Sequence, residues 1–192
     1  MFRKFLSSCM MSIVIMICIP TSYAQGTTDS AGWWQQTKDH LGNIVDNGAE
    51  KLYLSGYAYH GRNTYTAARI REYNEKAWGI GGGRTFRNAA GNDESLFFLG
   101  ISDSHSKPQL MAGYAYEWVF DIPKTPLEFS AGYTATLVSR QDYFGGLPFP
   151  MPLPLAGFGT KKAKLMASYV PRLSSNKGNG DVLLLFARFE ID

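Results

Sequence analysis

The chain has 192 residues, of which 45% are hydrophobic and 18% are charged, with a formal net charge of +3 and two cysteines. This length fits a single domain. The small positive charge gives no electrostatic argument for a nucleic-acid partner.

The N-terminus has the pattern of a secretory signal peptide. Arg3 and Lys4 precede an apolar run over residues 13–19, and the small residue Ala24 follows. We therefore predict a signal peptide over residues 1–24 and a mature domain over residues 25–192. A retained anchor helix would need about 20 apolar residues, more than this segment has. Cleavage removes both cysteines, which excludes disulfides, thiol catalysis and cysteine-ligated metals from the mature domain.

Residues 31–46 are predicted to form one amphipathic helix. Apolar side chains such as Trp33 and Ile44 recur on one face, and Ser30 is a suitable N-cap. The adjacent Trp33 and Trp34 suit a membrane interface, where an aromatic body lies in lipid and its N–H stays in water. Docking of the same helix on a soluble core is the alternative that this segment leaves open.

From residue 50 onward the chain is expected to be all-β, with many aromatic residues and glycines and no helix. Its apolar segments have the length of tilted membrane strands. An even number of them after a signal peptide predicts an eight-stranded antiparallel transmembrane β-barrel. A non-enzymatic small outer-membrane barrel and a secreted lipocalin-like lipid carrier are the alternatives. The eight apolar segments lie at 52–62, 77–87, 94–102, 109–120, 126–139, 149–159, 162–170 and 181–190.

The predicted strands depart from the apolar-out, polar-in alternation of a porin. Residues 96–101 and 182–187 are apolar at both parities, so we expect the outer wall and the interior both to be apolar. Small residues, among them Gly81, Gly113 and Ala115, would leave space inside for an acyl chain, since each buried CH₂ contributes about 0.8 kcal/mol. A fully packed interior is the competing interpretation.

Three polar residues are expected at one rim of this barrel. Antiparallel strands one and three end on the same side, which brings His60 and the pair Asp103 and Ser104 together. A histidine beside a hydroxyl and an acid can serve as the general base of an acyl transfer. An interface histidine and an ordinary Asp-Ser turn are the alternative interpretation.

No metal site or cofactor is predicted. His40, His60 and His105 lack metal-ligand spacing, and the glycine-rich segment 79–83 lacks the Lys-Ser/Thr of a phosphate loop. The lysines within residues 161–164 are expected to face solvent or lipid headgroups.

Seven spaced motifs occur in one order along the chain, at 59–60, 71–79, 103–104, 112–117, 150–156, 169–171 and 179–180. In these motifs the chain resembles the lipid A palmitoyltransferase family of the Gram-negative outer membrane, from about Trp33 to Glu190. The resemblance implies a barrel with an interior acyl pocket. It also implies transfer of a palmitoyl chain from the sn-1 position of a phospholipid to lipid A, with release of a lysophospholipid and without a cofactor.

The same resemblance implies partners, an orientation and site residues. The partners are a phospholipid donor, the lipid A acceptor and the outer membrane, with the active site on the extracellular side of a monomer or homodimer. Catalysis is assigned to His60, Asp103 and Ser104. Acyl-chain selectivity is assigned to Ala115, a position where the family has glycine, together with the neighbouring small residue Gly113.

Lateral access of lipids is implied at Pro150 and Pro171, since proline removes a hydrogen-bond donor from a strand ladder. Ser55 and Ala77 stand where the resemblance leads us to expect a second pair of gate prolines. The route of one of the two lipids is therefore left open by the sequence.

Overall fold

The computed structural model describes residues 30–142, 144–172 and 180–191. The chain divides into two compact units, Met1–Gln35 and Gln36–Asp192, and all eight strands belong to the second. The predicted signal peptide lies outside the described residues. No helix in the described part of the chain is long and apolar enough to cross a membrane.

The predicted N-terminal helix is confirmed as α2 (Ser30–Asn47). Ile44 on this helix is fully buried, and His40 pairs with Glu94 on a strand of the barrel. The helix ends at Asn47, and the N–H of the following Gly48 donates to the Ile44 carbonyl at 3.0 Å. A Cβ at Gly48 would lie 2.3 Å from that same oxygen, so this tight end requires glycine.

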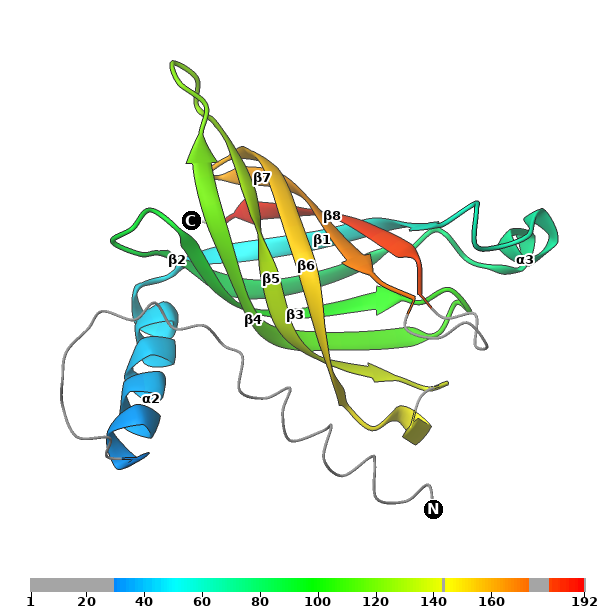
Figure 1. Ribbon diagram of the computed structural model, residues 1–192, viewed down its shortest axis with the longest axis horizontal. Coiled ribbons are helices and arrows are strands. Elements are labelled where there is room, and N and C mark those ends of the chain that lie inside the picture. The colour runs from blue at the N-terminus through cyan, green and yellow to red at the C-terminus, as the bar shows by residue number, and fades with distance from the viewer. Residues whose placement is uncertain (1–29, 143, 173–179, 192) are drawn as a thin grey trace. The chain divides into compact units, whose positions relative to one another are not determined.

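Eight strands form one closed antiparallel barrel in sequence order (Figure 1). Each predicted segment overlaps one strand, and the predicted ends lie within three residues of the observed ones. The predicted eight-stranded barrel is therefore confirmed. The strands are β1 (Ala49–His60), β2 (Gly79–Arg87), β3 (Asp93–Ser102), β4 (Pro108–Asp121), β5 (Leu127–Arg140), β6 (Phe149–Thr160), β7 (Ala163–Val170) and β8 (Val182–Glu190).

The outer face of the barrel is apolar. On β4, Leu110 and Trp118 are exposed, while Met111 and Glu117 on the opposite parity are buried. A barrel in lipid needs such an outward apolar band. Closure of the sheet meets a second need, because lipid offers no hydrogen-bond partner to a free strand edge. Exposed large side chains continue this wall on the other strands at Ile80, Phe98, Phe129, Leu137, Phe158 and Leu165.

The interior is apolar in only one of its two halves, which corrects the prediction made from residues 96–101 and 182–187. The half near the β3–β4 turn holds an apolar cluster that includes Leu99, Met111 and Leu184. The half near the β2–β3 and β6–β7 turns holds buried charged side chains. The prediction was wrong because no strand carries more than two of these inward charges, so no charged run marks them in the sequence.

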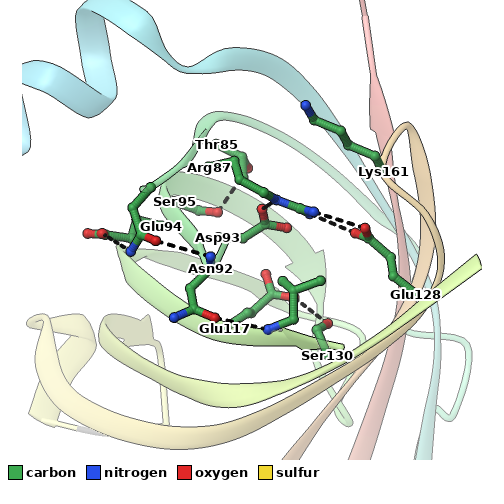
Figure 2. Close-up of polar contacts among 12 residues, drawn as sticks. Thr85, Arg87, Asn92, Asp93, Glu94, Ser95, Glu117, Glu128, Ser130 and Lys161 are labelled. Atoms are coloured by element: carbon green, nitrogen blue, oxygen red, sulfur yellow. Dashed lines mark hydrogen bonds and ion pairs between the residues drawn. The ribbon is translucent and has the colours of Figure 1, made fainter. Parts of the chain in front are cut away.

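We call this charged part of the interior the ionic layer. Arg87 makes a bidentate pair with Glu128 at 2.7 and 3.0 Å, and its Nε lies 2.6 Å from Asp93, as Figure 2 shows. Lys164 Nζ lies 2.7 Å from Glu128 Oε1, so this lysine is buried among carboxylates. The prediction that Lys164 faces solvent or lipid headgroups is therefore wrong. The layer balances three cations with three anions, namely Arg87, Lys164, Arg188, Asp93, Glu117 and Glu128.

The expectation that no helix follows residue 50 is wrong. A short helix, α3 (Ala67–Glu72), lies in the connection between β1 and β2, and a 3₁₀ turn, η1 (Phe144–Gly146), lies between β5 and β6. Thr66 caps α3, because its side-chain oxygen accepts the N–H of Arg69 at 3.3 Å. Six residues are too few for an apolar period to be visible in the sequence.

The ionic layer predicts a large stability effect at Glu117, which is fully buried and pairs with Arg188 and with Ser130. We expect Glu117→Gln to lower the free energy of unfolding by about 3–5 kcal/mol, because it leaves a buried cation short of a partner. Urea unfolding in detergent micelles measures this. Glu72→Gln, which affects only an exposed pair with Arg69, is the control and should leave the midpoint unchanged. Equal midpoints for both variants would contradict the assignment.

Candidate active site

The end of β1 and the turn after β3 meet at one rim of the barrel. His60 is the last residue of β1, and Ser104 follows β3 by two residues. His60 Nε2 lies 2.8 Å from Ser104 Oγ, and His60 is 1% exposed. The structure thus brings together two of the three predicted site residues, because antiparallel β1 and β3 flank β2 and end on the same side.

The third predicted residue, Asp103, contacts its own turn. Its Oδ1 accepts the backbone N–H groups of His105 and Lys107, each at 2.8 Å. Its Oδ2 lies 3.5 Å from Nη2 of Arg140. Within the described part of the chain, no hydrogen bond or ion pair joins Asp103 to His60. Asp103 therefore shapes the turn that carries the site hydroxyl.

A carboxylate that the sequence patterns did not reveal lies beside His60. Glu75, on the β1–β2 connection, accepts the backbone N–H of His60 at 3.1 Å, and the same Oε1 lies 3.4 Å from His60 Nδ1. Arg62 donates to both oxygens of Glu75, at 2.7 and 2.8 Å. This hydrogen-bonded guanidinium lowers the pKa of Glu75 to about 2. Its place within the motif of residues 71–79 was the only signal in the sequence.

Aromatic rings enclose the His60 imidazole. Tyr73 stacks on it with a centroid separation of 4.7 Å and an interplanar angle of 28°. Tyr65 meets it edge-on at 5.8 Å, and the Tyr65 hydroxyl donates to the Gly180 carbonyl at 2.6 Å. These contacts fix the plane of the imidazole and keep water from its faces.

Asn74 joins the β1–β2 connection to the turn after β3. Its backbone N–H donates to the Ser104 carbonyl at 2.8 Å. Its side-chain amide donates to Ser102 Oγ at 3.1 Å and to the Asp103 carbonyl at 3.3 Å. The connection that carries Glu75 and the turn that carries Ser104 are therefore positioned together.

One group of described residues has ligand atoms close enough for a metal ion. Atoms of Asp103, His105 and Asp142 lie within 4.8 Å of one another. Arg140 Nη2 lies 3.0 Å from Asp142 Oδ2 and 3.5 Å from Asp103 Oδ2. Because this guanidinium already pairs with both carboxylates at the place where an ion would lie, we assign the group no metal.

The apolar half of the interior contains a cavity of about 30 Å³. Ala115 lines it and packs with Leu155 and Met166. At its far end the cavity meets the ionic layer at Glu117 and Arg188. The interior thus holds an apolar compartment that is bordered by the charged side chains of Glu117 and Arg188.

Gly113, the other predicted selectivity residue, does not line this cavity. A Cβ at Gly113 would lie 2.2 Å from the carbonyl oxygen of Ala135 on β5, and one at Gly81 would lie 2.1 Å from that of Phe98 on β3. These glycines let neighbouring strands approach closely instead of opening interior space.

Strand pairing near the site rim is incomplete between β6 and β7. Only Leu155–Gly159 of β6 pairs with β7, while the rim half of β6 pairs with β5 alone. Pro150 lies on this stretch, and Pro171 directly follows β7. Since proline has no N–H, these residues weaken any ladder that could seal the wall.

The β1–β2 ladder also stops short of the rim, at the pair Ser55 and Gly79. Beyond this point Ser55 Oγ donates to the Ala77 carbonyl at 2.7 Å, and the Ala58 N–H donates to the Glu75 carbonyl at 2.9 Å. The two residues at the expected second proline pair therefore meet each other through a side-chain hydrogen bond.

Fold and site together define a membrane barrel in which a histidine and a hydroxyl meet at the rim of an apolar interior. Over residues 40–188 the chain matches the family described as antimicrobial peptide resistance and lipid A acylation protein PagP. It is 35% identical to a protein named lipid A acyltransferase PagP from Bordetella parapertussis, over 91% of this chain and 93% of the relative. Proteins with the same name from Methylobacillus flagellatus (34% identical, covering 88% and 90%) and Legionella pneumophila (32%, covering 98% and 100%) are also similar.

The chain therefore belongs to the PagP family, and it is an acyltransferase of the outer membrane. The family resemblance found in the seven sequence motifs is confirmed.

The Arg62 contacts predict how Glu75 titrates. Because its pKa is lowered in the folded protein, the pairing stabilises the connection above pH about 4.3 and is lost as the pH falls through about 2. We expect Arg62→Ala to raise the pKa of Glu75 from about 2 toward about 4.3. A carbon-detected NMR titration of the side-chain carboxyl measures it. An unchanged value in the variant would show that Arg62 is not the cause.

Proposed function

We propose that the protein transfers a palmitoyl or similar fatty acyl chain from the sn-1 position of a phospholipid to lipid A, releasing a lysophospholipid. The acceptor is supported by the names of the family and of the relatives, and the donor by the resemblance in the sequence motifs. The observation that carries the proposal is the 2.8 Å contact between His60 Nε2 and Ser104 Oγ at the mouth of an apolar interior.

His60 is the general base of this reaction. Acyl transfer needs a group that takes a proton from an oxygen nucleophile and returns it to the leaving oxygen. The nucleophile attacks the ester carbonyl of the phospholipid, the ester C–O bond breaks, and the lysophospholipid leaves with the proton from His60. A hydroxyl of lipid A ends as the new ester. Asp103 contributes by holding the turn that carries Ser104.

Two routes use this same base. In the first, Ser104 Oγ is itself acylated, and a lipid A hydroxyl then attacks the acyl-serine. In the second, Ser104 positions the lipid A hydroxyl for direct attack on the phospholipid. Mass spectrometry of protein quenched with a slowly reacting phospholipid analogue separates them, because only the first gives an acyl adduct on Ser104.

The acyl chain lies in the apolar half of the barrel, with its methyl end near Ala115. This residue is six positions along β4 from Gln109 at the rim, or about 20 Å of strand. The cavity of about 30 Å³ is much smaller than such a chain, so side chains have to move when it binds. Met166 beside Ala115 is suited to this because it is unbranched and flexible.

The rim that carries His60 faces the extracellular side, and one lipid enters sideways between β6 and β7. The incomplete pairing there, flanked by Pro150 and Pro171, supports this route. The β1–β2 seam is the second place near the rim where ladder hydrogen bonds are missing. There the Ser55 contact with Ala77 has to break for a lipid to pass.

Lipid A profiling tests the proposal. Mass spectrometry of lipid A from Gram-negative cells expressing the wild-type protein should reveal one added acyl chain. His60→Ala should lower this product by about 10²–10⁴-fold, the range for removing a general base. The control His40→Ala changes a histidine outside the site and should acylate normally, with folding followed by heat-modifiable gel migration. Equal acylation by wild type and the His60 variant would refute the proposal.

Chain-length selectivity is predicted to depend on Ala115. We expect Ala115→Gly to shift the preference toward a longer acyl chain, because removing the methyl group deepens the compartment. One methylene in an apolar pocket changes selectivity by about 10–200-fold. Competition between phospholipids of different sn-1 chain length measures the shift. Identical selectivity in the two proteins would contradict this role.

A further inference from the structure

We propose that Glu75 is the positioning carboxylate of the site, acting on the substrate through the imidazole of His60, whereas Asp103 acts only on the turn that carries Ser104. This inference rests on the proposed function, because it concerns the base of that acyl transfer. It adds Glu75 to the three residues that the family resemblance assigns.

The geometry places the carboxylate and the hydroxyl on opposite nitrogens of one ring. Ser104 Oγ lies 2.8 Å from Nε2, and Glu75 Oε1 lies 3.4 Å from Nδ1. For Nε2 to accept the serine proton it needs a free lone pair, which puts the ring proton on Nδ1, toward the carboxylate. A separation of 3.4 Å is long for a hydrogen bond, and such contacts commonly shorten when substrate binds.

Other contacts hold Glu75 where it can act on the ring. Its Oε1 also accepts the backbone N–H of His60, and Arg62 binds both of its oxygens. Tyr57 donates its hydroxyl to Oε2 at 3.2 Å. Because Arg62 keeps the pKa of Glu75 near 2, the carboxylate carries its charge throughout the physiological pH range.

The aromatic rings around His60 already orient the imidazole, so the proposed role of Glu75 is more than orientation. Tyr73 and Tyr65 already fix the plane of the imidazole. What these rings cannot do is choose which nitrogen carries the proton, or place an opposite charge beside the imidazolium that forms when His60 takes the proton of the nucleophile. A carboxylate near Nδ1 does both.

In the observed arrangement Asp103 cannot be the carboxylate that acts on Nδ1 of His60. Both of its oxygens are occupied, one by two backbone N–H groups of its turn and the other by Arg140. Among the described residues, the charged groups that face His60 are Glu75 and Arg62, and its other neighbours are Ser104, the Ala58 backbone, Tyr65 and Tyr73.

The test compares Glu75→Gln with Asp103→Asn in purified full-length protein in mixed micelles. The Glu75→Gln change keeps nearly the same side-chain size and an oxygen that can accept the His60 N–H, but it removes the charge. For this variant we expect kcat to fall by about 10²-fold with little change in KM. The ascending limb of its pH–rate profile should move to lower pH, because the imidazolium form loses its anionic neighbour. Glu75→Asp, which keeps the charge, should restore the limb toward the wild-type pH.

For Asp103→Asn the limb should stay at the wild-type pH, because Asp103 does not contact His60. A wild-type kcat and profile for Glu75→Gln, beside an inactive His60→Ala, would overturn this inference and leave the proposed function standing. A loss of activity in both Glu75 variants without any shift of the limb would also overturn it, since that is the result of a merely structural role. An active His60→Ala would instead overturn the proposed function.

Discussion

A β-sheet in hydrocarbon has to close on itself, because lipid offers no hydrogen-bond partner to a free edge. Eight strands enclose an interior only wide enough for side chains or one slender ligand. In this chain charged side chains around Glu117 and Arg188 fill one half of that interior, and apolar side chains around Leu99 and Leu184 fill the other. In the proposed reaction an acyl chain fits only the apolar half, so closure of the barrel would determine both the place of the acyl chain and the rim at which it reacts.

The rim is also where the strands stop constraining the backbone. The connection over residues 61–78 returns to the rim and delivers Glu75 to His60, while Asn74 bonds the same connection to the turn that carries Ser104. Because each of these contacts holds another in place, the imidazole of His60 and the hydroxyl of Ser104 are held at hydrogen-bonding distance. Such preorganisation is what an acyl transfer at a membrane surface requires.

The strands, their number and the meeting of His60 with Ser104 could be predicted, because strand length, turn residues and antiparallel order are local or topological properties of the sequence. The ionic layer could not, since Asp93, Glu117 and Lys164 come from different strands and only closure of the barrel joins them. Glu75 was missed for a different reason. It lies 15 residues from His60 in an irregular connection whose path back to the rim no periodicity predicts.

The central claim is that one acyl chain moves from a phospholipid to lipid A at the His60 and Ser104 rim. The most direct measurement uses purified protein in mixed micelles with lipid A and a phospholipid isotopically labelled in its sn-1 chain, with all products quantified by mass spectrometry. The account predicts labelled acyl-lipid A and lysophospholipid in equal amounts, with both lost in His60→Ala. Labelled free fatty acid without labelled lipid A, or transfer that persists in His60→Ala, would contradict it.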